Sequence, residues 1–559
     1  MNHLKNNILL IVLGYVFLMM GNGLVPLTHP DEVFYAQTAK EMLARNTWLT
    51  PILFDQPQFE KPILFYWLLT FMAKFFGLTA FTARFCPAFF GMLGILITYW
   101  IAWLLFGNKR VSFLAGLIQG TSFMYIALSR AVLTDMVFSI WVILSLGAFY
   151  GTYRYQRQGG PTWGFLFSFV FMGLAVLTKG LLGLFFPVGT VVLFLSLRNG
   201  LGFVRNRAVL GGVFLFLLIT GPWHGYMISR YGDSFINEYF FNVHVRRLFV
   251  AEHQKCNTWY FYMLTLGMGI LPWTFFFVPA AARIPCLYQK RPSCKEPFIF
   301  LLSWFLGVLI FVQPASSKLA SYIFPAFPVV TILAALCIDD FLYAYQDIGP
   351  RTVRCVQLSM SFFGGVLLLA SAGAVMARDY YRSFAPHAWP VVVMALAFGL
   401  LGVLVIFFSR RKAYHAVTGL FALFPLILIL SFLLFRSMAV SWVSCYDIGN
   451  ILKTLDQSGT TVLASKFYVR GVRYFTDRDM ATINVWGQDF YSPHPIPLLD
   501  TDRKVAEFLR TQPFTFAVVK KGDMEDLMRI CSLNGFALRN LGGLGGKYIL
   551  KIQPESVKR

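Results

Sequence analysis

The sequence has little charge. Only 13% of its 559 residues are Asp, Glu, Lys or Arg, whereas soluble domains carry about 25%. Hydrophobic residues make up 57%, and Phe alone occurs 59 times. This composition excludes a disordered chain, a disulfide scaffold and an ordinary soluble enzyme. It predicts a polytopic α-helical membrane protein.

Acidic residues are the scarcer kind of charge. The chain has 26 Asp and Glu against 48 Lys and Arg, a net charge of +22. In a membrane protein, basic cytoplasmic loops and anionic lipid substrates explain such an excess, so we expect no nucleic-acid partner. The eight Cys residues lack the spacing of a metal site. A disulfide among Cys256, Cys445 and Cys531 is left open.

Thirteen apolar runs approach the roughly 20 residues needed to cross a bilayer. They lie near 7–26, 85–106, 111–128, 133–151, 163–178, 180–197, 208–229, 258–280, 297–313, 322–339, 355–376, 388–408 and 416–436. With the N-terminus inside, the short loops rich in Lys and Arg face the cytoplasm, as the positive-inside rule requires. An odd number of spans then puts the C-terminus outside.

The composition changes near residue 445. About a quarter of residues 445–559 are charged, against about a tenth of residues 1–444. Strand-like runs at 461–464, 514–519 and 547–551 alternate with helix-like runs at 448–455, 503–510 and 524–531. We expect a membrane domain at 1–444, with outside loops at 27–84, 129–135, 230–257 and 314–321, and a small soluble α/β domain at 445–559. The Gly-rich run 542–546 lacks the Lys-Ser/Thr of a phosphate loop and predicts a β-turn.

Charges are almost absent from the predicted spans and gather in the outside loops. An ion-coupled transporter would place Asp, Glu or His near the bilayer midplane. An enzyme that acts on lipid head groups would place them at the membrane boundary. The distribution favours the enzyme, with a transporter and a non-catalytic scaffold for the soluble tail as alternatives.

Two outside loops supply carboxylates. Asp31 and Glu32 follow Pro30 at the start of a helix-like run, where they either complement the helix dipole or face a substrate. Asp135 begins the fourth span and needs a partner there. Arg130 is the ordinary candidate for that partner, and an active site shared with Asp31 is the functional one.

Three further residues could form a polar or metal-binding group. Glu60 and Lys61 are either a solvated pair at a turn or part of a functional site. The second interpretation is favoured because they precede an apolar run at interface depth, where a charge pair without a function is costly. His244 could join Glu60 in holding a divalent cation. Two ligands alone do not define a metal site.

The remaining outside loops supply cations. Lys179 either extends its amine to the membrane surface or contacts a phosphate. Arg247 lies in the fourth loop. Lys318 and Tyr322 are four residues apart and would share a helix face. Together with the carboxylates, these cations indicate transfer chemistry with a phosphate or pyrophosphate leaving group.

At these residues the chain resembles the GT-C glycosyltransferases that use a polyprenyl-phosphate sugar, above all the bacterial aminoarabinose transferases and their protein-mannosyltransferase-like relatives. The resemblance rests on four motifs in order: Pro30-Asp31-Glu32-x-x-Tyr35-Ala36, Phe59-Glu60-Lys61-Pro62, Thr178-Lys179-Gly180 and Lys318-Leu319-x-x-Tyr322. It departs at Val243, where the family often has Glu, and at Ala320, where it has Pro.

The resemblance implies an inverting transfer of 4-amino-4-deoxy-L-arabinose from undecaprenyl phosphate to a lipid A phosphate, at the periplasmic face of a bacterial inner membrane. A protein or glycan hydroxyl is the alternative acceptor. The implied roles are catalytic for Asp31, Asp135, Glu32 and Lys61, substrate or lipid-phosphate binding for Lys179, Arg247, Lys318, Tyr322 and Tyr35, and metal binding for Glu60 and His244. We expect one divalent ion (Zn, Mg or Mn) at most, no organic cofactor, membrane lipids as partners and a monomer.

Overall fold

The computed structural model describes residues 2–200, 206–250, 256–290, 294–377, 389–455, 459–485 and 496–555. The chain forms two compact units. The first consists of Met1–Asn22, Phe59–Phe65 and Arg84–Leu433, and the second of Gly23–Gln58, Tyr66–Ala83 and Leu434–Arg559.

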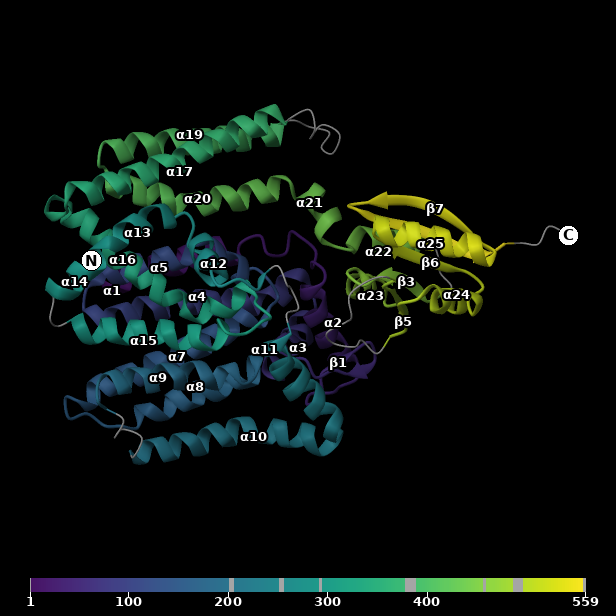
Figure 1. Ribbon diagram of the computed structural model, residues 1–559, viewed down its shortest axis with the longest axis horizontal. Helices are drawn as coiled ribbons and strands as arrows, with labels where there is room; N and C mark the ends of the chain where they lie inside the picture. The colour runs from purple at the N-terminus through teal and green to yellow at the C-terminus, as the bar shows by residue number, and fades with distance from the viewer. Residues whose placement is uncertain are drawn as a thin grey trace. The chain divides into compact units, whose positions relative to one another are not determined.

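Helices make up the described part of the first unit (Figure 1). Its N-terminal half contains α1 (His3–Gly14), η1 (Tyr15–Met19), α4 (Ala80–Phe106), α5 (Lys109–Gly120), α6 (Phe123–Ser129), α7 (Thr134–Gln156), α8 (Gly164–Lys179), α9 (Leu182–Leu197), α10 (Arg207–Phe235), η3 (Ile236–Arg246) and α11 (Arg247–Phe249). Its C-terminal half contains α12 (Phe261–Gly269), α13 (Thr274–Ala280), η5 (Ala281–Arg283), α14 (Ile284–Lys290), α15 (Lys295–Val312), η7 (Ala320–Ala326), α16 (Phe327–Tyr343), η8 (Tyr345–Asp347), α17 (Pro350–Met376), α19 (Trp389–Arg410) and α20 (Tyr414–Leu434).

Each predicted apolar run contains helix, but the helices differ in length. Within the described residues, eight helices are long and apolar enough to cross a membrane, and a ninth span results if α5 and α6, bent by 61°, are taken together. Helices α1 with η1, α8 and α9 are apolar but shorter. The run at 258–280 is divided into α12 and α13. The polytopic helical architecture is as predicted, and the number thirteen stays a prediction.

Small residues and buried hydroxyls hold neighbouring helices together in this unit. Ser145 on α7 and Ser168 on α8 each donate a hydrogen bond of 2.8 Å to the other's backbone carbonyl. A Cβ atom on Gly307 of α15 would lie 2.4 Å from the Thr190 hydroxyl of α9, so only glycine permits this approach. Such contacts are typical of membrane helices, where lipid is as apolar as a leucine side chain and close packing drives association.

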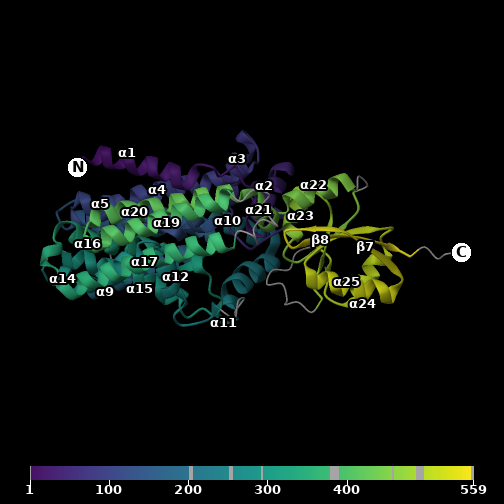
Figure 2. The same cartoon turned by 90° about the horizontal axis from the view of Figure 1, so that it is seen from above.

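The second unit is built on a six-stranded sheet in the order β5-β4-β3-β6-β8-β7. Its strands are β3 (Val462–Ser465), β4 (Met480–Ile483), β5 (Leu498–Leu499), β6 (Thr515–Val519), β7 (Phe536–Leu544) and β8 (Lys547–Pro554). The first four in this order are parallel, and β8 runs antiparallel to β6 and β7. Helices α24 (Asp502–Arg510) and α25 (Lys521–Asn534) cover one face, and α22 (Tyr446–Leu455) and α23 (Val469–Thr476) the other (Figure 2).

The sequence predicted this part of the second unit well. The expected strands and helices appear within a few residues of their predicted bounds. The glycine run forms the turn of the β7–β8 hairpin, with Gly545 and Gly546 at φ of 58° and 74°. It is therefore a β-turn, as predicted, because two consecutive residues of positive φ favour glycine. All eight cysteines are free, so Cys256, Cys445 and Cys531 form no disulfide.

The predicted domain boundaries differ from the observed units. The first long loop, with α2 (Asp31–Ala44), β1 (Ile52–Leu53), β2 (Gln56–Pro57) and most of α3 (Leu64–Phe76), groups with the C-terminal residues, including α21 (Arg436–Val443). Lys40 pairs with Asp477 at 2.6 Å, and Asp55 with Arg473 at 2.6 Å. Hydropathy does not predict these pairs, because their partners lie more than 400 positions apart.

Candidate active site

A buried ion pair joins two helix ends in the first unit. Asp135 lies in the first turn of α7, and Lys179 is the last residue of α8. Their side chains are paired and only 9% and 7% exposed. Each helix dipole favours the charge at its end. Arg130, the expected ordinary partner of Asp135, instead donates hydrogen bonds of 3.0 Å to the carbonyls of Phe17 and Met20.

The segment before α16 completes the surroundings of this pair. The Tyr322 ring centroid lies 4.9 Å from the Lys179 amine, and that of Phe138 lies 5.5 Å away. Ser321 hydrogen-bonds the Asp135 carboxylate. Lys179 therefore has a carboxylate and two aromatic faces around its charge, all of which favour the cation.

Lys61 adds a second cation to this region. It lies in the loop before α3 and is half-buried. The pKa of Lys61 is lowered to about 8, chiefly by burial and then by the positive charges of Arg247 and Lys179, against the opposing effect of Glu60 and Asp135. Lys61 is thus repelled by two other cations, one of which is already paired with Asp135. A bound anion would relieve that repulsion.

Gly180 brings the end of α8 against the η3 segment. Its φ of 100° and ψ of −158° belong to a region that only glycine occupies freely. A Cβ atom at this position would lie 2.5 Å from His244 Nε2. The Thr178-Lys179-Gly180 motif therefore has a steric reason: glycine both ends the helix and admits the imidazole ring.

The surroundings of His244 do not fit the predicted metal pair. Its Nδ1 lies 2.6 Å from the Tyr239 carbonyl and must carry the proton, because a carbonyl only accepts. Its Nε2 accepts a 3.4 Å hydrogen bond from the Leu181 amide, and Lys61 and Arg247 place positive charge nearby. Among the described residues, no three His, Cys, Asp or Glu side chains could together hold a metal. Glu60 is half-buried in the loop before α3, and a metal on this pair stays a prediction.

The loops that carry Arg247 and Lys318 are held by backbone contacts. The amides of Ser316 and Ser317 donate to the carbonyls of Leu248 and Arg247 at 3.0 and 3.1 Å.

The prediction that Lys318 and Tyr322 share a helix face is wrong. Leu319 is extended, and the helical segment begins only at Ala320.

Lys318 contacts a different segment from Tyr322. Its amine, in a side chain that is 4% exposed, donates to the Asn257 side chain at 3.0 Å and to the Thr258 carbonyl at 3.2 Å. Lys318 thus fixes the residues before α12, whereas Tyr322 faces Lys179. The role of Lys318 in phosphate binding stays a prediction.

Three predicted site residues belong to the second unit. Asp31 is exposed at the start of α2. The Glu32 carboxylate accepts hydrogen bonds from the Thr28 amide at 2.8 Å and the Thr28 hydroxyl at 2.9 Å, which joins the first turn of α2 to the residues before it. Tyr35 is 6% exposed, and its ring centroid lies 5.9 Å from that of Tyr66. Glu32 and Tyr35 thus have structural partners. An active site shared by Asp31 and Asp135 stays a prediction.

Several residues near the ion pair had no motif to mark them. Ser321 and Phe138 contact Asp135 and Lys179, and Tyr239 binds His244 and also lies 3.3 Å from His224 Nε2. In the sequence, these residues could have been found only from their position next to predicted site residues or within a run of aromatic residues.

The chain is similar to known proteins in sequence and in fold. A family model for dolichyl-phosphate-mannose-protein mannosyltransferases matches residues 8–284. The undecaprenyl phosphate-alpha-4-amino-4-deoxy-L-arabinose arabinosyl transferase of Pectobacterium carotovorum is 30% identical over 386 residues, which cover 67% of each chain. The chain belongs to the aminoarabinose transferase family. An uncharacterised protein of Aquifex aeolicus is also 30% identical, over 370 residues that cover 66% of this chain and 68% of the relative.

The family fold is also the fold of this chain. The crystal structure of ArnT from Cupriavidus metallidurans bound to undecaprenyl phosphate matches it with a TM-score of 0.76 over 98% of each chain, at 20% identity. The predicted GT-C membrane fold is therefore confirmed. As a member of the aminoarabinose transferase family, the chain is a polytopic membrane glycosyltransferase of the GT-C type. The transporter and scaffold alternatives are thereby rejected.

Proposed function

We propose that the chain transfers 4-amino-4-deoxy-L-arabinose from undecaprenyl phosphate to a phosphate of lipid A. The observation that carries this proposal is the group of three cations in which Lys61 lies near both Arg247 and the Lys179–Asp135 pair. Such a group favours a ligand whose negative charge grows during the reaction. The family relatives, named for this donor, support the choice of sugar and lipid.

The chemistry matches the charge of the site. An acceptor phosphate oxygen attacks C1 of the sugar, and the bond between C1 and the oxygen of the donor phosphate breaks. The departing undecaprenyl phosphate changes from a diester with one negative charge to a monoester, which carries about −1.5 to −2 at pH 7. Lys61 and Arg247 would stabilise that added charge as it develops. Attack opposite the leaving group inverts the configuration at C1.

Asp135 serves this reaction by positioning Lys179. Its carboxylate is already bound by the Lys179 amine and the Ser321 hydroxyl. An acceptor phosphate is an anion near neutral pH and needs no strong base. The role left for Asp135 is to fix the Lys179 amine and to balance the local positive charge.

A hydroxyl acceptor on a protein or glycan is the second candidate. The match of residues 8–284 to the protein mannosyltransferase family favours it. A hydroxyl must lose its proton during attack and needs a general base. Asp31, exposed at the start of α2, would be that base.

The proposed setting is the bacterial inner membrane. We place the N-terminus in the cytoplasm and the second unit in the periplasm, because this orientation puts the short basic loops inside. Lipid A phosphates would then meet the donor on the periplasmic side. We further propose that the protein acts as a monomer and needs no organic cofactor.

A transfer assay in proteoliposomes tests this function. Several polyprenyl-phosphate sugars are supplied with lipid A and, in parallel, with a peptide or glycan that offers a hydroxyl acceptor. Product stereochemistry is recorded for the wild type and for Asp31→Asn. Asp477→Asn serves as the control, since it removes a carboxylate of the same unit whose exposed pair with Lys40 contributes about 0–1 kcal/mol. Inverted aminoarabinose transfer to lipid A supports the proposal. Transfer only to a hydroxyl acceptor, abolished in Asp31→Asn, supports the second candidate.

A further inference from the structure

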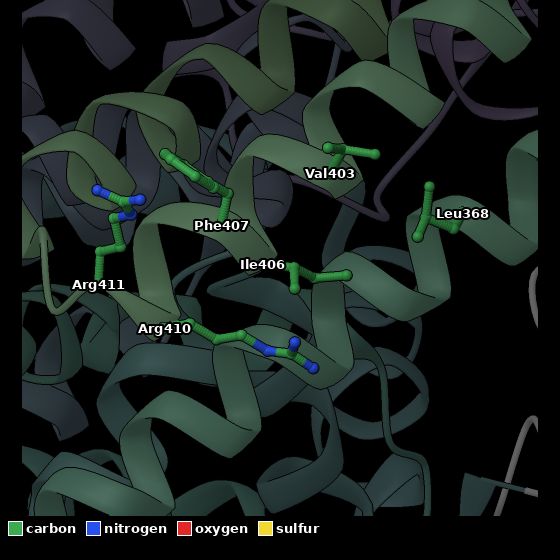
Figure 3. Close-up of a pocket in the computed structure, with 6 residues that line it drawn as sticks. All are labelled: Leu368, Val403, Ile406, Phe407, Arg410 and Arg411. Carbon is green, nitrogen blue, oxygen red and sulfur yellow. The ribbon is translucent and has the colours of Figure 1, made fainter.

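Two helices remote from the ion pair form a groove with a basic end. Leu368 of α17 and Val403, Ile406 and Phe407 of α19 line it, together with Arg410 and Arg411. Its volume is about 340 Å³, within the range of small-molecule sites. Figure 3 shows Arg410 extended on the same side as Ile406, with Arg411 beside Phe407.

The groove belongs to a tightly joined helix pair. A Cβ atom on Gly364 or on Gly402 would lie 2.7 Å from the carbonyl oxygen of the other glycine. At the basic end, Gln357 Nε2 and Ser409 Oγ each donate a 3.0 Å hydrogen bond to the other residue's backbone carbonyl. At the far end, the Ser371 hydroxyl donates to the Ala395 carbonyl at 2.6 Å. The walls are therefore held in place without a ligand.

The open side of the groove is apolar. Val403 is 52% exposed and Phe407 45% exposed. Both helices are long and hydrophobic enough to span a membrane. Side chains of this kind on a spanning helix face hydrocarbon, so an acyl chain is the ligand that fits between them.

The basic end has no carboxylate of its own. Some basic residues at helix ends are paired, as Arg110 is with Asp339 at 3.2 Å and Arg283 with Asp340 at 2.7 Å. In the part of the chain that the structure describes, no carboxylate pairs with Arg410, Arg411 or Lys412. Arg411 instead lies 4.8 Å from the centroid of the Phe407 ring. Two exposed guanidinium groups next to an apolar groove suit a phosphate attached to acyl chains.

We propose that this groove binds one anionic phospholipid, with an acyl chain along Leu368, Val403 and Ile406 and its phosphate between Arg410 and Arg411. The site is separate from the sugar-transfer residues and uses none of them. A lipid bound here would complete the charge balance of the α19–α20 turn and brace the α17–α19 pair in the membrane.

Native mass spectrometry of the purified full-length protein tests the site. The protein is incubated with equal amounts of phosphatidylglycerol and phosphatidylethanolamine of the same acyl chains. We expect selective retention of phosphatidylglycerol, and a roughly 30-fold loss of its affinity in Arg410→Gln/Arg411→Gln, since each basic residue near a membrane surface contributes about 1 kcal/mol. Val403→Trp, which fills the groove from its exposed side, should lower retention without removing charge.

The matched control is Arg351→Gln/Arg354→Gln. It removes two exposed arginines at the start of α17, the helix end that meets the same membrane surface as the end of α19. Because neither arginine lines the groove, the variant should leave retention within about twofold of the wild type. Equal loss in both double variants would overturn the site in favour of general surface charge. Equal retention of the two lipids, or displacement of the bound lipid by inorganic phosphate alone, would also overturn it.

Discussion

Asp135 and Lys179 form a buried ion pair between the N-terminus of α7 and the C-terminus of α8. The pair explains why a carboxylate is tolerated at the end of a membrane span. It also connects a carboxylate for which the family resemblance implies a catalytic role with a lysine for which it implies a phosphate contact. The first prediction tests this connection.

Asp135→Asn should leave the Lys179 charge buried without its partner. Breaking a buried pair costs about 3–5 kcal/mol, and we expect both lower thermal stability and loss of sugar transfer. The double variant Asp135→Asn/Lys179→Met removes both charges and should regain most of the stability, yet stay inactive. Thermal unfolding in detergent and a transfer assay measure the two effects. Activity in the double variant would contradict a role for the pair in the reaction.

Donor binding should depend on the protonation of Lys61. Its pKa of about 8 lies below the usual 10.5 because the side chain is buried near Arg247 and Lys179. A bound phosphate favours the charged amine, so affinity for the donor should be full below pH 8 and fall as the pH rises through about 8. Donor KM measured across this range checks the direction.

Lys61→Arg is the matched variant for that measurement. Arginine keeps its charge at all accessible pH values. The pH dependence of KM should therefore flatten while the site keeps its cation. An unchanged pH profile in Lys61→Arg would show that another group titrates there.

Gly180→Ala should destabilise the first unit. Alanine is strained at φ of 100°, and its Cβ would lie 2.5 Å from His244 Nε2. We expect a cost of about 1–3 kcal/mol. Gly225→Ala is the control, because a Cβ there meets no atom within 4 Å in the interior of α10. Adding His244→Ala to Gly180→Ala should relieve the clash but keep the backbone strain, so only part of the loss should return.

Removal of divalent metal should leave transfer within about twofold of its starting rate. The reason is that both ring nitrogens of His244 already have protein partners, the Tyr239 carbonyl and the Leu181 amide, so ligation would cost hydrogen bonds. Activity with EDTA, and again after adding back Zn²⁺, Mg²⁺ or Mn²⁺, measures this. Strict dependence on one metal would mean that His244 turns away from Tyr239 during the reaction.

Some site residues can be recognised from their place in the sequence, whereas others depend on a backbone conformation or a contact that the sequence does not show. Asp135 and Lys179 were recognisable because charges at the ends of apolar runs are costly and need a purpose. The shared helix face predicted for Lys318 and Tyr322 was wrong, because four-residue spacing implies a shared face only inside a helix, and Leu319 is extended. The catalytic role predicted for Glu32 stays a prediction; the contact that its carboxylate makes with Thr28, four residues earlier, had no signal in the motif.

The sequence by itself determined which segments lie in lipid and which lie in water. Long apolar runs must become helices in lipid, because no water is present there to bind backbone groups, and the alternating runs after 445 had to form an α/β unit. Tertiary structure alone decided which distant residues meet. It paired Asp135 with Lys179 rather than Arg130, set His244 against Gly180, and grouped α2 with the C-terminal sheet. Such contacts depend on packing across many residues of chain, and no local pattern encodes them.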